Sequence, residues 1–185
     1  MRADDIPEYV QDGVVDCGIT GLDIVREQAL AVSVLATLGF GACTLEAAVP
    51  TESAACSLDD LAGARVATSF PRLVRELVPR SELVDVHGSV ELAPRLGLAD
   101  AIVDLVSSGS TLRTNGLRSL GVLLESEAVL IAPPEATAKT RQLAGVFRSV
   151  VDARDARYLM LNAPEAALGE ICALVPGSRA PSVLP

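Results

Sequence analysis

The sequence has few basic residues: 15 Lys and Arg stand against 24 Asp and Glu, and the formal net charge is −9 at pH 7. A nucleic-acid-binding surface needs clustered Lys and Arg to neutralise phosphates, whereas here they are scattered along the chain. We therefore exclude nucleic acid as a partner. A small anionic ligand is compatible with the charge, because backbone N–H groups at loops and helix starts bind anions without adding net charge.

Cysteine and histidine are also sparse. The four cysteines lie far apart, form no CxxC pair and have no histidine at ligand spacing, so neither a zinc site nor a disulfide framework is indicated. They are Cys17, Cys43, Cys56 and Cys172. We expect reduced thiols that fill core volume. The single histidine, His87, is favoured as a strand-end residue, although Asp85 two positions away leaves a catalytic pair open.

The sequence shows no secretory signal and no membrane-spanning pattern. The start, Met1 to Asp5, has no apolar stretch behind a basic residue, so a cytoplasmic location is expected. The uncharged stretch 28–45 approaches the roughly 20 residues that a spanning helix needs. Its Gly39 and Gly41 favour a turn between a soluble helix and a buried strand, and no membrane contact is expected.

Short apolar segments alternate with helical patterns over the whole length. Strands or apolar runs are predicted at 14–19, 45–49, 65–68, 83–87, 101–106, 128–132 and 157–162. Helices are predicted at 4–13, 22–38 (vague in its second half), 57–62, 70–78, 90–97, 137–153 and 165–174. This alternation predicts an α/β architecture with mostly parallel sheets.

The loop after the apolar strand 101–106 is the clearest candidate site. It offers hydroxyl groups and approachable backbone N–H groups to one phosphate from Ser107, Ser108, Gly109, Ser110 and Thr111. The loop lacks the Gly-Lys-Ser/Thr ending of a P-loop, so a nucleoside triphosphatase is not indicated. Asp104, in the strand before it, is predicted to accept hydrogen bonds from ribose hydroxyls or to hold magnesium. A merely polar turn is the alternative.

The run from Gly88 to Asp104, continued by this loop and by Asn115-Gly116-Leu117, resembles the core signature of ATP phosphoribosyltransferase. Further matches follow in order along nearly the whole chain. They are Asp5-Ile6-Pro7, Asp16-Cys17-Gly18-Ile19-Thr20-Gly21, Gly39-Phe40-Gly41 and Ala67-Thr68-Ser69-Phe70-Pro71. So long an ordered series is more specific than any single motif.

The resemblance implies a two-lobed fold like that of type II periplasmic binding proteins, with the active site in the cleft. It implies a reaction in which N1 of the ATP adenine displaces pyrophosphate from phosphoribosyl pyrophosphate (PRPP), with Mg²⁺, as the first step of L-histidine biosynthesis. If the family's site residues are carried over to this sequence, the loop Ser107–Thr111 binds the 5-phosphate, and Asp104 binds the ribose hydroxyls or the metal. Glu91 lies near the reacting ribose and adenine. The residues lining the cleft from the other lobe, towards ATP, are Asp16, Gly18, Thr20 and Gly21.

No nucleophile or base is assigned, because positioning and charge stabilisation can carry such a displacement. Under the resemblance the chain divides into a first lobe, a second lobe with the phosphate loop, and the start of a C-terminal regulatory domain. These comprise residues 1–49 with 128–153, residues 50–127, and residues 154–185. Relatives form dimers, or hexamers in the complete long form, so a homo-oligomer is expected.

Relatives carry a strand and a Lys-Gly-Arg type loop ahead of the segment that begins at Arg2, and commonly a basic residue where Thr44 stands. The first lobe is therefore expected to be incomplete. The alternative to an enzyme is a non-catalytic fragment or regulatory ligand-binding module that keeps the phosphate loop. A weaker alternative is an extracytoplasmic solute-binding protein, which shares the fold but normally has a signal sequence.

Overall fold

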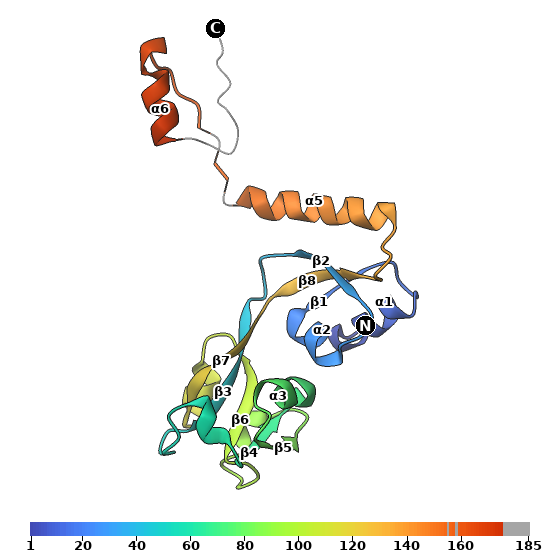
Figure 1. Cartoon of the computed structure of the whole chain (residues 1–185), viewed down its shortest axis with the longest axis vertical. Helices are drawn as coiled ribbons and strands as arrows, with labels where there is room; N and C mark the ends of the chain where they lie inside the picture. The colour runs from blue at the N-terminus through green and yellow to red at the C-terminus, as the bar shows by residue number, and fades with distance from the viewer. Residues whose placement is uncertain (155, 158, 176–185) are drawn as a thin grey trace. The chain divides into compact units, whose positions relative to one another are not determined.

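The computed structural model describes residues 1–154, 156–157 and 159–175 (Figure 1). The chain separates into two compact units, Met1–Asp152 and a second one that starts at Ala153. The first unit holds two β-sheets and every residue of the candidate site. The second contains the 3₁₀ turn η4 (Glu165–Ala167) and the helix α6 (Leu168–Leu174).

A three-stranded antiparallel sheet forms the first lobe, in the order β1 (Gly18–Gly21), β8 (Ala128–Ala132), β2 (Ser33–Thr37). The middle strand alternates between two apolar layers, as a strand buried on both faces must. Its Val129 and Ile131 pack with Val10 of α1 (Ile6–Gln11) and with α2 (Leu22–Gln28). Its Leu130 packs on the opposite side with Ala144 of α5 (Ala138–Arg154).

A five-stranded mixed sheet forms the second lobe. Its order is β5 (Glu82–Asp85), β4 (Arg65–Thr68), β6 (Ala101–Val106), β3 (Cys43–Pro50), β7 (Leu117–Ser126). The strands β5, β4 and β6 are parallel, whereas β3 is antiparallel to both of its neighbours.

Both faces of this sheet are covered. On one face Val66 and Val103 pack against Leu73 of α3 (Pro71–Leu77) and against η2 (Leu58–Leu61). On the other face Ile102 packs against η3 (Val90–Leu92) and α4 (Ser110–Thr114). Asp104 follows Ile102 by two positions and therefore continues the second face towards the end of β6.

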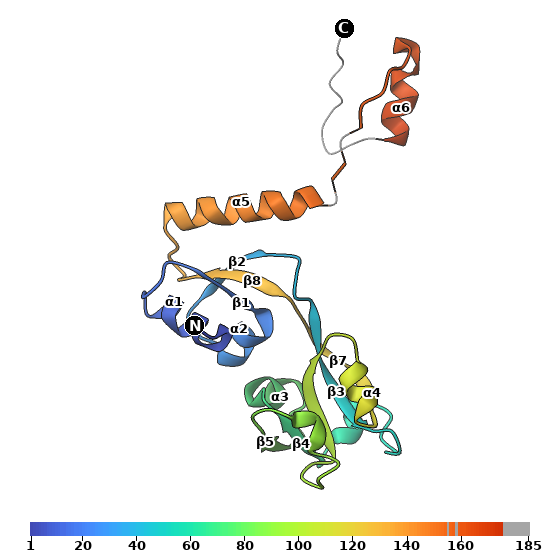
Figure 2. The same ribbon diagram turned by 180° about the vertical axis from the view of Figure 1, so that it is seen from behind.

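Two adjacent segments connect the lobes. One is residues 38–42, between β2 and β3, and the other is Glu127, the single residue between β7 and β8. Cys43 and Ser126, at the two crossing points, lie opposite each other in the sheet. Figures 1 and 2 show β3 and β7 running side by side out of the β2 and β8 region. The crossings form a two-stranded hinge.

The two-lobed α/β class is confirmed, but the first sheet is antiparallel and the second is mixed, and four of the six strand pairings are antiparallel. The reason lies at the hinge. The strand β3 runs from the hinge into the second sheet, and its neighbour β7 runs back towards the hinge, so the two strands are antiparallel. The predicted lobe boundary after residue 49 needs correction for β3, which pairs only with β6 and β7. The second sheet thus begins at Cys43.

Several predicted elements differ from those observed. Residues 14–16 are bends and residue 17 has no regular structure, so only Gly18 and Ile19 of the predicted strand pair with β8. The second half of the helix 22–38 is the strand β2, and the helix 90–97 is only a short 3₁₀ turn. Strand β7 was not predicted.

Beyond the lobes, the predicted helix 165–174 is confirmed as η4 and α6. The predicted strand 157–162 is not formed at residues 157 and 159–162, which are exposed. The predicted regulatory segment 154–185 includes residues 155, 158 and 176–185, which lie outside the described residues. Among the helices of the described part, none is long and apolar enough to cross a membrane.

Candidate functional site

The phosphate loop lies where the sequence predicted it, directly after β6 and before α4. Gly109, at the N-cap of α4, has a φ of 67°, a left-handed conformation that favours glycine. Gly109 itself offers no side chain to cap this helix start, and the backbone N–H of Ser110 donates to the hydroxyl oxygen of Ser108 at 3.5 Å. The hydroxyl oxygens of Ser108 and Ser110 lie 2.9 Å apart. The loop therefore presents two converging hydroxyls beside the backbone N–H groups at the start of α4, an arrangement suited to an anion.

The loop encloses a small cavity of about 90 Å³, which we call the phosphate pocket. Its lining is Glu91, Asp104, Leu105, Val106, Ser107, Ser108, Gly109, Ser110, Thr111 and Leu112. The volume is about three times the roughly 30 Å³ that one water occupies in the liquid. It suits one phosphate-sized group and is too small for a whole nucleotide. The structure brings together all seven residues that were predicted to bind PRPP.

Asp104 lies at the inner wall of the phosphate pocket. Its Oδ1 accepts a hydrogen bond from the backbone N–H of Leu105 at 2.8 Å. Burial raises the pKa of Asp104 and the nearby negative charge of Glu91 raises it further, while the Leu105 bond lowers it. The two carboxyl groups thus share one small site from different elements, β6 and η3. A cationic or hydroxyl-bearing ligand would relieve this repulsion.

A larger cavity of about 680 Å³ adjoins the phosphate pocket at the hinge, and we call it the hinge pocket. It is lined by Leu22, Gly39, Ala42, Cys43, Thr44, Val106, Ser107, Glu125, Ser126 and Glu127. Val106 and Ser107 line both cavities. Its volume falls within the roughly 300–1,000 Å³ typical of pockets for small organic ligands. One ligand can therefore extend from the phosphate loop into the hinge.

The residues predicted to line the cleft from the first lobe line neither of these two pockets. Asp16 is exposed, and Thr20 is buried with its hydroxyl donating to the carbonyl oxygen of Ala3 at 2.9 Å. Gly18 packs against α1, where an added Cβ would lie 2.3 Å from Cγ2 of Ile6. Gly21 adjoins the Asp23 carboxylate. Of this segment, Leu22 is the residue that lines the hinge pocket.

A buried polar pair fixes the start of α2 to the hinge. Ser126 is 5% exposed and donates its hydroxyl hydrogen to Asp23, which is also 5% exposed. The backbone N–H of Asp23 donates to the same hydroxyl oxygen at 3.0 Å. Burial raises the pKa of the adjacent Cys43 thiol and the Asp23 charge raises it further, while Ser126 lowers it. No sequence pattern indicated this pair, because 103 positions separate its members.

Two further residues near the pockets were missed. Arg113 reaches back from α4, and its Nη1 lies 3.4 Å from the carbonyl oxygen of Ser108. It brings a positive charge close to the phosphate loop. Thr44 donates its hydroxyl hydrogen to Glu46 at 2.6 Å, with the carbonyl oxygen of Val106 at 3.2 Å. Arg113 adjoins the recognised loop in sequence, so its position could have been anticipated.

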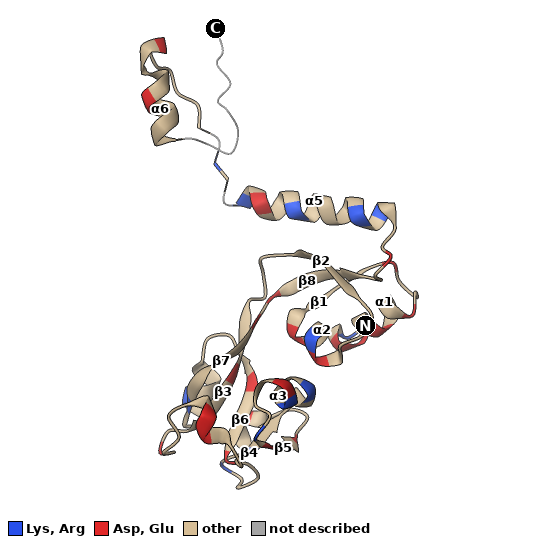
Figure 3. Cartoon of the chain, in the orientation of Figure 1, with Lys and Arg blue, Asp and Glu red and all other residues tan. Residues whose placement is uncertain are grey.

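The other charged groups do not form a second site. His87 and Asp85 lie 3.8 Å apart, but the His87 side chain is 85% exposed and lines neither pocket. Figure 3 shows Lys and Arg spread along α2, α3 and α5 rather than gathered on one element. In the described part of the chain, no group of three or more His, Cys, Asp or Glu side chains is placed to hold a metal ion.

Comparisons with known proteins agree with this geometry. Residues 2–151 match the family described as ATP phosphoribosyltransferase, and residues 153–185 match its C-terminal domain. The ATP phosphoribosyltransferase of Natronomonas pharaonis is 43% identical over 99% of this chain and 67% of its own length. That of Cytophaga hutchinsonii is 40% identical over 100% of this chain and 68% of its own length. The chain thus spans about two thirds of these relatives.

Solved structures give the same fold. A chain of the ATP phosphoribosyl transferase (HisG:HisZ) complex from Thermotoga maritima matches with a TM-score of 0.70 and 25% identity, over 82% of this chain and 78% of that one. A Gly52Ala mutant of the arginine-bound ArgBP from T. maritima matches with a TM-score of 0.60 and 19% identity, over 80% and 73%. The second likeness concerns the fold alone. The family match over both lobes and the sequence identity to its enzymes establish that this chain belongs to the ATP phosphoribosyltransferase family.

Proposed function

We propose that this chain condenses ATP with PRPP to give N1-(5-phosphoribosyl)-ATP and pyrophosphate, the first step of L-histidine biosynthesis. The observation that carries the proposal is the junction of the two pockets at Val106 and Ser107. The 5-phosphate of PRPP would occupy the phosphate pocket. The adenine would enter the hinge pocket, whose volume of about 680 Å³ admits it. The ribose would then lie between them, next to Asp104.

The reaction forms a bond from adenine N1 to the ribose C1 and breaks the bond from C1 to the pyrophosphate oxygen. Hydroxyls of Ser108, Ser110 and Thr111 would hold the 5-phosphate, and Asp104 would accept hydrogen bonds from the ribose hydroxyls. Glu91 and Asp104 place negative charge beside the ring, which stabilises the positive charge that develops as pyrophosphate departs. Holding both reactants in this geometry supplies the rest of the rate enhancement.

Magnesium is the cofactor that this proposal requires. Asp104 and Glu91 fit the ion, because Mg²⁺ prefers carboxylate oxygens and usually takes one or two of them together with substrate phosphates and water. The lack of a three-carboxylate cluster in the described residues fits the same mode. When bound, the ion would neutralise charge on the departing pyrophosphate.

The test is the absorbance increase of phosphoribosyl-ATP formation with ATP, PRPP and Mg²⁺. We compare the chain with Asp104→Asn and with the matched control Asp85→Asn, which alters an exposed carboxyl at the end of β5 in the same sheet. Loss of a charge-assisted hydrogen bond predicts at least about a tenfold lower kcat/KM for Asp104→Asn and no change for the control. Equal rates in the two variants would contradict the assigned role of Asp104.

We also propose that this chain associates with further copies of itself or with a protein partner. The similar T. maritima chain was solved in a complex of two named components. In the present chain α5 leaves Leu143, Val146 and Val150 at 41%, 56% and 55% exposure, an apolar row at helical spacing. We expect an oligomer, dimeric or larger, in the cytoplasm. Light scattering after size-exclusion chromatography measures the mass, and a monomer at every concentration would contradict this part.

A further inference from the structure

The two lobes keep separate apolar cores. Among the described residues, buried apolar side chains form four clusters, two in each lobe, and none of the four joins the two sheets. Inter-lobe surfaces without a shared apolar core permit relative motion of domains. The lobes can therefore separate about the hinge without exposing a core.

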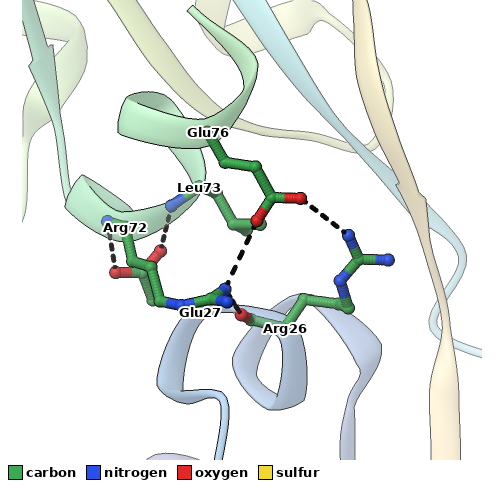
Figure 4. Close-up of polar contacts among 5 residues, drawn as sticks. All are labelled: Arg26, Glu27, Arg72, Leu73 and Glu76. Carbon is green, nitrogen blue, oxygen red and sulfur yellow. Dashed lines mark hydrogen bonds and ion pairs between the residues drawn. The ribbon is translucent and has the colours of Figure 1, made fainter. Parts of the chain in front are cut away.

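Away from the hinge, the lobes meet through a polar contact between α2 and α3 (Figure 4). The carboxylate of Glu27, at the end of α2, accepts hydrogen bonds from the backbone N–H groups of Arg72 at 2.8 Å and Leu73 at 2.9 Å. These groups lie in the first turn of α3, whose N-cap residue Phe70 provides no side-chain bond. A residue of the first lobe thus caps a helix of the second, a role normally filled by the residue just before the helix.

Three weaker contacts surround this cap. Nη1 of Arg72 donates to the carbonyl oxygen of Arg26 at 2.6 Å. Glu76 pairs with Arg26 at 3.4 Å and with Arg72 at 3.6 Å. The paired side chains are 46–47% exposed, so solvent screens these ion pairs and each adds little. The contact is specific in geometry and modest in strength, as a reversible contact needs to be.

The other end of α2 lies at the hinge. Leu22 lines the hinge pocket, and Asp23 bonds to Ser126 at the crossing of the second strand. The helix has seven residues, a length of about 10 Å. Through α2, one short rigid element therefore joins the hinge pocket to the contact with α3. A change at Glu27 acts on the same helix that forms a wall of that pocket.

We infer that Arg26, Glu27, Arg72 and Glu76 form a latch between the lobes, and that release of Glu27 from α3 opens the hinge pocket. In this arrangement the latch sets the balance between closed and open lobes before ligand binds, as in other proteins that close about a hinge. That the admitted ligand is a substrate rests on the proposed function. The opening itself does not, and it can be measured on the ligand-free chain.

The test uses two readouts on the full chain without substrates. Hydrogen exchange at the amides of Arg72 and Leu73 reports the cap. Alkylation of Cys43, which lines the hinge pocket, reports pocket opening, and exposed Cys56 in the same molecule is the internal reference. Peptide mass mapping separates the two thiols. For Glu27→Gln we expect about tenfold faster exchange at both amides and a Cys43 to Cys56 labelling ratio that is several-fold higher.

The matched control is Glu8→Gln, an exposed glutamate on α1 away from the contact, for which both readouts stay at the wild-type level. Faster exchange in Glu27→Gln with an unchanged labelling ratio would overturn the gating role. Unchanged exchange would overturn the latch. If Glu27→Gln also loses protection throughout β6, its fold is affected and Glu27→Asp decides instead. That variant keeps the charge but is one methylene shorter, and faster exchange at Arg72 and Leu73 with an unchanged labelling ratio in it would then overturn the inference.

Discussion

A Cβ atom on Gly21 would lie 2.4 Å from Oδ1 of Asp23, closer than any real contact. Gly21 has a φ of −76°, which every residue can adopt, so backbone strain does not require glycine here. The requirement comes from the Asp23 carboxylate, held in place by Ser126. Gly21→Ala should therefore break a buried hydrogen bond at the hinge and cost about 1–3 kcal/mol in the free energy of unfolding, measured by urea titration.

Gly145→Ala provides the control for this substitution. Gly145 lies within α5, and an added Cβ there meets nothing within 4 Å. Replacing a helical glycine by alanine should stabilise the protein by about 0.5–1 kcal/mol. Destabilisation in both variants would mean that the first effect does not arise from Asp23.

Asp104→Asn should make the chain more stable at neutral pH, although it should impair catalysis. Because the pKa of Asp104 is raised in the folded state, the folded chain holds this proton more tightly than the unfolded chain does. The resulting stabilisation is complete below the unfolded pKa of about 3.9 and is lost as the pH rises through the folded pKa. Above the folded pKa the ionised carboxylate therefore destabilises the fold, and asparagine removes that charge.

Calorimetry across pH checks this prediction. The Tm of Asp104→Asn should exceed that of the wild type at pH 7, by about 2–4 °C for each kcal/mol gained in a chain of this size. The difference should shrink towards pH 3. A Tm that is lower than wild type at pH 7 would show that asparagine loses more in contacts, including the bond from Leu105, than it gains from the absent charge.

Ser110→Ala should weaken PRPP binding. Its hydroxyl lies 2.9 Å from that of Ser108, so the two hydroxyls converge at the N-terminal end of α4. A hydrogen bond to a charged phosphate contributes about 1.5–3 kcal/mol, which predicts a KM for PRPP raised about tenfold or more. Ser149→Ala, in α5, serves as the control because its hydroxyl bonds only within its own helix. Matching KM values in the two variants would place the phosphate elsewhere.

Removing magnesium should stop turnover without changing the stability of the ligand-free chain. The proposed protein ligands are two carboxylates, those of Asp104 and Glu91, and substrate phosphates and water are expected to complete the coordination of the ion. We expect EDTA to abolish phosphoribosyl-ATP formation, excess Mg²⁺ to restore it, and the Tm without substrates to stay constant. A Tm that falls with EDTA would reveal a resident structural ion.

The phosphate pocket could be predicted from the sequence because it is local. Nine of its ten lining residues are the continuous run from Asp104 to Leu112, and only Glu91 comes from elsewhere. A buried strand followed by a polar, Gly-containing loop marks such a site without knowledge of the rest of the fold. The loop's position after β6 is also the place where α/β sheets bind ligands.

The hinge pocket could not be predicted in the same way. Its lining comes from α2, from the first crossing, from the end of β6 and from the second crossing, and no spacing rule links these segments. The missed strand β7 shows the same limit, since its burial alternates irregularly around two register shifts in its pairing with β3. The cleft-lining prediction for Gly18 and Gly21 also could not include the close approach of Ile6 and Asp23 to these glycines, because those contacts depend on the folded structure.

The position of β8 in the middle of the first sheet has a consequence for folding order. Both β1 and β2 pair only with β8 in that sheet, so neither gains its backbone partner until residue 132 has been synthesised. The second sheet needs only residues 43–126, which are complete earlier. During synthesis the second lobe should therefore fold first. Until β8 has been synthesised, β1 and β2 lack this pairing partner and are prone to aggregation.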